Sequence, residues 1–237
     1  MDQEPREIVI ATGNPHKVEE MRAILGSAAA SAGYAVVGLK DLEARGLGPF
    51  EEPEEIGQTF EHNAATKALA YAEQTGRVCV ADDSGLEIDA LGGQPGVISS
   101  HYFNDGRTDG AAAGMGRDER DRRNNERVLQ ELAGVEWARR GARFVCVMVV
   151  AGGGERLAMF RGTFEGRIGF GAGQSDQAEL VVPRGMNGFG YDPLFLVGPG
   201  FERTSAEMEA AEKNAVSHRA RAGEQLAAWL REGGLGG

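Results

Sequence analysis

The stretch IVIATGNP, residues 8–15, predicts how the chain begins to fold. Its first four residues are apolar and mostly β-branched, which favours a buried strand, and the Thr12-Gly13 step favours a tight turn. Asn14 is a good helix N-cap and Pro15 suits the first helical position, and apolar residues follow at helical spacing through position 25. The chain therefore opens with a strand, a glycine turn and a helix.

Strand and helix patterns continue along the rest of the chain. Strands are expected at residues 35–37 and 78–81, and a hairpin over 144–164 turns at three glycines, 152–154. Helices are expected over 60–74, 118–132 and 217–230, and a further helix begins at 204 with a capping box. Because strand-helix-strand units are combined with a hairpin, we expect an α/β fold with a mixed sheet. No internal repeat or Pro/Ser-rich linker divides residues 1–237, which predicts a single domain.

Composition excludes several classes of function. The chain has 25 Lys and Arg against 36 Asp and Glu, and its net charge of −11 argues against binding polymeric nucleic acid or a membrane surface. No apolar run reaches the length of a membrane span, and the start MDQE is too acidic for a signal peptide. Cys79 and Cys146 lie in apolar runs, which is typical of buried thiols in a reducing compartment. We expect a cytoplasmic globular protein.

The first candidate site is TGNPHK, residues 12–17. Backbone N–H groups at a helix N-terminus bind anions, Gly13 lets a phosphate approach, and Lys17 adds a positive charge. The spacing differs from that of a Walker A loop, which has a longer glycine span before its lysine. Lysine is rare in this chain, with four lysines against 21 arginines, so each position that keeps one is of interest. The alternative is an ordinary strand-to-helix turn with a solvated lysine.

The second candidate site is ADDSG, residues 81–85, where two adjacent carboxylates leave a predicted strand and enter a predicted glycine turn. Adjacent side chains on a strand point to opposite faces, so we expect only one of Asp82 and Asp83 to face a ligand. Such a carboxylate binds Mg²⁺ or takes a proton from water. Glu55, in the acidic run 51–55, is a candidate second oxygen ligand. The alternatives are a solvated Asx turn and a solvated acidic surface.

The third candidate site is GFGYDP, residues 188–193. Glycines on both sides of Phe189 free the backbone and expose the ring, which can then stack on a flat ligand. Asp192 precedes a proline and is therefore expected in extended backbone, where it can accept hydrogen bonds from a base edge. The alternative is an aromatic turn that closes the core.

The fourth candidate site is KNAVSHR, residues 213–219, at a predicted break between helices. Lys213, His218 and Arg219 are three donors near one helix start, and they suit a carbonyl or phosphate oxygen. His218 taken alone is more often a structural histidine. The other histidines show no spacing typical of metal ligands.

Six motifs in this order resemble those of the inosine triphosphate pyrophosphatase family, the noncanonical purine nucleoside triphosphate pyrophosphatases. The matching stretches are TGN with Lys17, FEHNAATK at 60–67, ADDSGL at 81–86, LGGQPG at 91–96, GFGYDP at 188–193 and SHR at 217–219. They cover nearly the whole chain. The resemblance implies an elongated α/β fold with a mixed β-sheet flanked by helices, two lobes with a central cleft, and a homodimer. It also implies Mg²⁺-dependent hydrolysis of ITP, dITP and XTP or dXTP to the monophosphate and pyrophosphate, which cleanses the nucleotide pool.

The resemblance also implies roles for individual residues. The triphosphate would be held by Thr12, Gly13, Asn14, Lys17 and Lys67. Mg²⁺ would be bound by Glu55 and Asp83, and the residues with catalytic roles would be Asp83 as the base together with Lys17 and Lys67. The remaining substrate contacts would be Ser84, Phe189, Gly190, Tyr191, Asp192, Lys213, His218 and Arg219, of which Phe189 would stack on the purine.

The implied chemistry agrees with the residue types present. A phosphoanhydride is cleaved by positioning and charge neutralisation, without a covalent residue. Donors aimed at a 6-oxo oxygen lose their partner when a 6-amino group takes its place, which discriminates against adenine. One alternative is a Maf-type pyrophosphatase for modified pyrimidine nucleotides, against which the SHR and GFGYD motifs argue. Another is a nucleotide-binding sensor without turnover, which the retention of both Lys17 and Asp83 disfavours.

Overall fold

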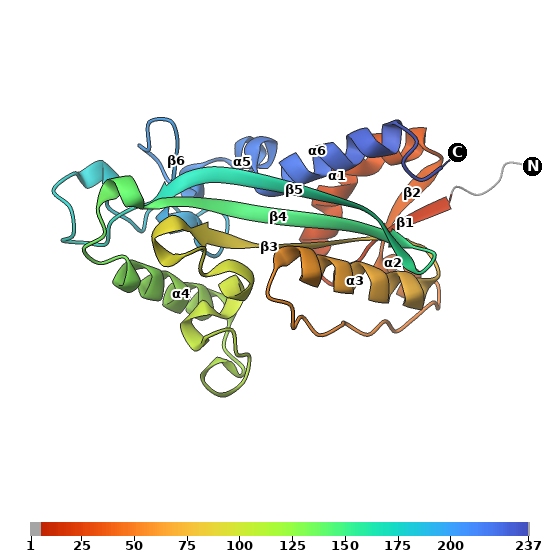
Figure 1. Ribbon diagram of the computed structural model, residues 1–237, viewed down its shortest axis with the longest axis horizontal. Helices are drawn as coiled ribbons and strands as arrows, with labels where there is room; N and C mark the ends of the chain where they lie inside the picture. The colour runs from red at the N-terminus through yellow and green to blue at the C-terminus, as the bar shows by residue number, and fades with distance from the viewer. Residues whose placement is uncertain (1–5, 237) are drawn as a thin grey trace, which may run out of the picture. The chain divides into compact units, whose positions relative to one another are not determined.

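The computed structural model describes residues 6–236, apart from the side chains of His16 and Ala111. Within these residues six strands form one sheet in the order β2-β1-β3-β4-β5-β6 (Figure 1). The strands are β1 Arg6–Ile10, β2 Tyr34–Gly38, β3 Val78–Ile88, β4 Gly141–Gly152, β5 Glu155–Ile168 and β6 Phe195–Val197. β1 pairs in parallel with β2 and β3, whereas β5 pairs antiparallel with β6. The prediction of a mixed sheet in an α/β fold is confirmed.

The hairpin and the helices predicted after Asn14 and over 60–74, 118–132 and 217–230 also form. The α-helices are α1 Pro15–Ser31, α2 Leu39–Ala44, α3 Phe60–Thr75, α4 Arg117–Glu131, α5 Ala210–Val216 and α6 His218–Arg231. As expected, the Thr59 side chain caps α3 by accepting a hydrogen bond from the His62 N–H at 3.2 Å. Gly153 and Gly154 have φ of 62° and 84°, and this backbone lets them form the two-residue turn between β4 and β5.

The chain divides into two compact units, each considered by itself. Unit 1 takes in the residues up to Asp83, Cys146–Gly162 and the residues from His218 on. Unit 2 consists of Ser84–Val145 and Thr163–Ser217. The long strands β3, β4 and β5 each contribute one part to each unit.

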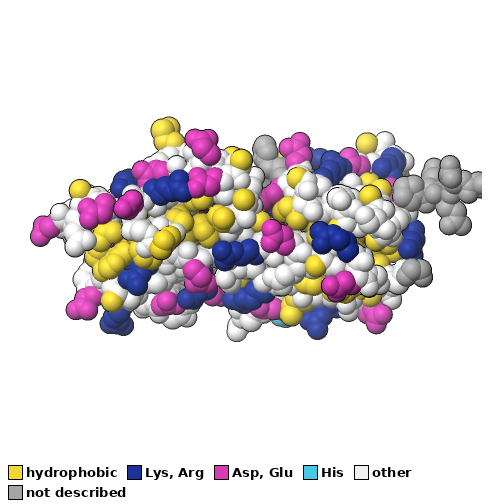
Figure 2. Space-filling model, turned by 90° about the horizontal axis from the view of Figure 1, so that it is seen from above, with side chains coloured by type: hydrophobic (Ala, Val, Ile, Leu, Met, Phe, Trp, Pro, Cys, Tyr) yellow, Lys and Arg dark blue, Asp and Glu magenta, His cyan; other side chains and the backbone are white. Residues whose placement is uncertain are grey.

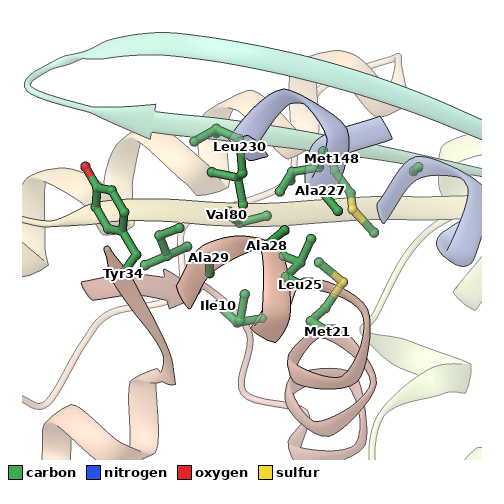
Figure 3. Close-up of a cluster of buried hydrophobic side chains, with 14 of the residues drawn as sticks. Ile10, Met21, Leu25, Ala28, Ala29, Tyr34, Val80, Met148, Ala227 and Leu230 are labelled. Carbon is green, nitrogen blue, oxygen red and sulfur yellow. The ribbon is translucent and has the colours of Figure 1, made fainter. Parts of the chain in front are cut away.

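The core of unit 1 packs two helices on one face of its strands. Ile10, Val80 and Met148 from three strands meet Leu25 of α1 and Leu230 of α6, and all five side chains are buried (Figure 3). α1 and α6 lie side by side on this face, as Figure 1 also shows. Because this apolar packing fixes both helices on the strands, it also fixes where their first residues lie relative to β3.

One prediction about β3 is wrong. Residues 82–85 do not form a glycine turn, because β3 runs without a break from Val78 to Ile88. The two aspartates fit within the strand because side chains from helices on either face pair with them. Beyond them, Leu86 and Ile88 are fully buried in the core of unit 2, which keeps the backbone extended.

Unit 2 corrects two further predictions. Asp192 is not in extended backbone; it opens a 3-10 turn, Asp192–Leu194, because its side chain accepts hydrogen bonds from its own loop. The capping box between Thr204 and Glu207 is present, but it starts only a short 3-10 segment, Ser205–Glu207, and α5 begins later at Ala210. The predicted capping box is confirmed, but the predicted start of the α-helix at 204 is wrong.

The surface agrees with the composition. On the face seen in Figure 2, basic and acidic side chains are interspersed, and no extended basic patch gathers there. None of the helices within residues 6–236 is both long enough and apolar enough to span a membrane.

Candidate active site

The two aspartates of β3 point to opposite faces of the strand, as predicted. Asp82 faces α1 and α6, where Lys17 Nζ lies 2.9 Å from its Oδ2 and Arg219 Nη2 lies 3.5 Å away. Asp83 faces α3, where the Asn63 amide donates to its Oδ2 at 3.2 Å and Lys67 Nζ lies 3.5 Å from its Oδ1. One strand thus carries two carboxylates with separate surroundings.

Asp82 is the centre of a compensated ion cluster. Arg219 is buried, and besides Asp82 its guanidinium also reaches Glu20 of α1 at 3.2 Å. Burial would raise the pKa of Asp82, but Lys17 and Arg219 outweigh it and hold that pKa far below the usual range. The Asp82 carboxylate is therefore permanently charged, and it ties the first turns of α1 and α6 to β3.

The charge of Asp83 is less fully balanced by cations than that of Asp82, because Asp83 shares its lysine, Lys67, with Glu55. Burial raises the pKa of Asp83, Lys67 opposes that rise, and the nearby Glu55 carboxylate adds to it. Lys67 is itself buried and also donates to Glu55 Oε1 at 3.1 Å. Its pKa is raised, because Asp83, Asp82 and Glu55 outweigh the effect of burial. One lysine therefore pairs with two carboxylates, Asp83 and Glu55.

Asn63 links these carboxylates and was not among the predicted site residues. Its Oδ1 accepts the Gly57 N–H at 2.8 Å, which holds the loop that carries Glu55, while its Nδ2 donates to Asp83. Gly57 is needed for this approach, because a Cβ there would lie 2.4 Å from Asn63 Oδ1. The available signal was spacing, since Asn63 and Lys67 are four residues apart on one helix face.

The turn after β1 borders a cavity of about 200 Å³. The cavity is lined by Thr12, Gly13, Pro15, Val18, Glu19, Arg22, Gly38, Lys40 and Asp41. In the turn the Asn14 N–H donates to Thr12 Oγ1 at 3.2 Å, and the Val18 N–H donates to the Asn14 carbonyl oxygen at 3.3 Å. Lys17 points instead to Asp82. Lys40, one of the four lysines of the chain, lines this cavity and was not among the predicted site residues.

In unit 2 the Phe189 ring is exposed, as predicted, with 60% of its surface accessible. Gly188 and Gly190 have φ of 79° and 64°, so both adopt backbone that favours glycine. A Cβ at Gly188 would lie 2.1 Å from Asp192 Oδ2. The ammonium of Lys213 lies 5.5 Å from the centre of the Phe189 ring, within range of a cation–π contact.

Asp192 organises this loop from within. Its carboxylate is buried and accepts from the Phe189 N–H at 2.9 Å and from Ser205 Oγ at 2.6 Å, and it pairs with Lys213. Tyr191 is buried beside it, and its hydroxyl donates to the Ser99 carbonyl oxygen at 2.6 Å. The motif that presents Phe189 is therefore a closed hydrogen-bonded turn.

The predicted site residues fall into separate groups. Unit 1 holds Lys17, Asp82 and Arg219 on one face of β3, and Glu55, Lys67 and Asp83 on the other. Unit 2 holds Phe189, Asp192 and Lys213 together. His218 begins α6 in unit 1, and Ser84 begins the unit 2 part of β3. Among residues 6–236 no group of three or more His, Cys, Asp or Glu side chains is gathered to hold a metal ion.

Known proteins are similar to this chain over most of its length. The model of the Ham1 family matches residues 8–229 of the chain. The chain belongs to the Ham1 family. This confirms the family expected from the motifs.

Two relatives in the Ham1 family are named dITP/XTP pyrophosphatase. The one from Bacillus licheniformis is 40% identical over 225 residues, which are 95% of this chain and 98% of the relative. The one from Bacillus subtilis is 42% identical over 225 residues, 95% of this chain and 97% of the relative. Among solved structures, the Staphylococcus aureus Ham1 protein is similar with a TM-score of 0.73 and 35% identity, covering 96% of this chain and 99% of that one.

Removing the charge of Asp82 and removing that of Asp83 should have different effects on the free energy of unfolding. In metal-free protein at pH 7, Asp82→Asn should lower the free energy of unfolding by about 3–5 kcal/mol, because it leaves Arg219 buried without its main partner. Asp83→Asn should leave that free energy unchanged or raise it, because the folded state disfavours the charge of Asp83. Urea denaturation in EDTA measures both variants, and equal losses would contradict this account.

Proposed function

We propose that this Ham1 family chain hydrolyses dITP, ITP and XTP or dXTP to the nucleoside monophosphate and pyrophosphate. It is a nucleoside triphosphate pyrophosphatase, in line with the names of its relatives. The observation that carries the mechanism is Asp83, a buried carboxylate with a raised pKa beside Lys67 and Glu55. A carboxylate of that kind is suited to take a proton from the attacking water.

The phosphates are held by cations and by a helix N-terminus. Thr12, Gly13 and Asn14 form the turn before α1, whose first N–H groups favour an anion. Lys17 and Lys67, which flank β3 on its two faces, supply positive charge for the triphosphate oxygens. Phosphoryl transfer needs this kind of positioning and charge neutralisation and no covalent residue.

Glu55 and Asp83 fit Mg²⁺ as two hard oxygen ligands. Both carboxylates lie against the single ammonium of Lys67, so together the three groups carry a net negative charge. Mg²⁺ typically takes one or two carboxylates and completes its shell with phosphate oxygens and water. When bound, it would mask the charge of the triphosphate. Asn63 keeps both carboxylates in place by holding the Gly57 backbone and Asp83 together.

The base is recognised by stacking and by donors. Phe189 offers an exposed ring held by the turn of residues 188–192, which also contains Gly190 and Tyr191, two further proposed substrate-binding residues. Lys213, His218 and Arg219 are the proposed donors to the 6-oxo group, with Asp192 holding Lys213 and Ser84 completing the substrate contacts. A 6-amino group in place of the oxygen would leave the donors unpaired.

Further parts of the proposal concern the protein as a whole. We propose that residues 1–237 form a single pyrophosphatase domain that acts as a homodimer in the cytoplasm. The buried free thiols of Cys79 and Cys146 support a reducing compartment. The net charge of −11 and the interspersed charges on the face seen in Figure 2 support a small nucleotide rather than polymeric nucleic acid as the ligand.

Replacing the proposed base should separate binding from turnover. Asp83→Asn should lower kcat for dITP by about 100-fold or more while nucleotide binding is largely retained, because the amide cannot accept the proton. Single-turnover assays and equilibrium binding of dITP measure the two effects. Turnover like that of the wild type would exclude Asp83 as the base.

The substrate assignment is tested by comparing nucleotides. With Mg²⁺ present, kcat/KM for dITP and XTP should exceed that for dATP by at least about 100-fold, because the unpaired donors penalise adenine. The products should be the monophosphate and pyrophosphate. Comparable values for dATP and dITP would refute recognition of the 6-oxo group, and release of orthophosphate would refute the reaction type.

A further inference from the structure

α4 holds the residue that follows Phe189 from two sides. Asp121 Oδ2 accepts the Gly190 N–H at 2.8 Å, and Asn125 Nδ2 donates to the Gly190 carbonyl oxygen at 3.1 Å. Asp121 and Asn125 are four residues apart and therefore share one face of the helix. Both backbone polar groups of Gly190 are thus bound by side chains of α4.

These contacts control the direction of the Phe189 ring. The Gly190 N–H belongs to the peptide that joins Phe189 to Gly190, so fixing it fixes the backbone beside the ring. Gly190 has a φ of 64°, and the two hydrogen bonds hold it there. On the other side of the ring, the Phe189 N–H donates to Asp192. Because the ring itself is 60% exposed, its direction depends on this backbone more than on packing.

α4 is itself firmly anchored within unit 2. Next to Asn125, Asn124 is buried, and its amide accepts the Phe103 N–H at 2.9 Å and donates to the Ser99 carbonyl oxygen at 3.2 Å. Val128, one turn further, is fully buried in the unit 2 core. The helix can therefore transmit a fixed position to the Phe189 turn.

We infer that Asp121 and Asn125 are positioning residues that set the affinity for the purine base by holding Phe189 in its stacking orientation. This inference rests on the proposed function, because it requires that Phe189 stacks on the base. Neither residue touches the substrate; each acts through Gly190. Stacking on an aromatic ring contributes to binding in the ground state and the transition state alike, so its loss appears in KM rather than kcat.

The test compares steady-state kinetics of the full chain with dITP. Asp121→Ala and Asn125→Ala should each raise KM by roughly fivefold to 20-fold and change kcat by less than about threefold. Asp121→Asn keeps an acceptor for the Gly190 N–H and should recover part of the loss. Asp118→Ala is the matched control, because Asp118 is exposed one turn earlier on the same helix, and its kinetics should equal those of the wild type.

A double-mutant cycle with Phe189→Ala distinguishes positioning from a general loss of structure. In the Phe189→Ala background, Asp121→Ala should have no further effect on KM, because the ring that it positions is absent. An equal rise in KM in both backgrounds, or an unchanged KM in the single variants, would overturn the inference. A wild-type protein without dITP turnover would instead refute the proposed function and this inference with it. If Asp121→Ala does not fold, the same double-mutant cycle is measured with Asn125→Ala or Asp121→Asn in its place.

Discussion

The carboxylate of Asp82, in the middle of β3, is paired with two cations, and this ion cluster joins the first turns of two helices to the strand. Asp82 draws Lys17 from the first turn of α1 and Arg219 from the first turn of α6 onto one face of the strand. The apolar core behind them holds the same two helices in place. Because side chains alternate along a strand, Asp83 must then point to the other face, towards α3.

On the face of β3 that is turned towards α3, the negative charges are less fully balanced by cations. Asp83 and Glu55 share Lys67, so the folded protein keeps a carboxylate in surroundings that favour its protonated form. An unfavourable buried charge of this kind lowers the stability of the fold, and such charges are common at functional sites. The folded protein therefore treats adjacent residues in opposite ways: it favours the charged form of Asp82 and disfavours that of Asp83. In unit 2, hydrogen bonds hold the Phe189 turn rigid: the Phe189 N–H donates to Asp192, and the Gly190 N–H donates to Asp121 of α4.

Local pattern was enough to predict most of the secondary structure and most of the residues that cluster. The strand at 8–11, the Thr59 cap and the glycine hairpin depend on neighbouring residues, so they are visible in the sequence. The strand through Asp82 and Asp83 was mistaken for a turn because the partners that make it tolerable lie up to 137 residues away. Asn63 and Asp121 were not predicted for a related reason, since their hydrogen bonds to Gly57, Asp83 and Gly190 exist only in the folded chain. Asp192 was assigned to extended backbone from its proline neighbour, but its own side-chain hydrogen bonds decide its conformation.

The two neighbouring aspartates of β3 have pKa values shifted in opposite directions. Carboxyl carbon chemical shifts of Asp82 and Asp83, followed by NMR through an acid titration of the metal-free protein, measure this directly. We predict that Asp82 stays ionised well below the usual aspartate midpoint of about 4, whereas Asp83 takes up its proton at a pH above that midpoint. Titration of both carboxylates together in the ordinary range, or in the reverse order, would contradict the account.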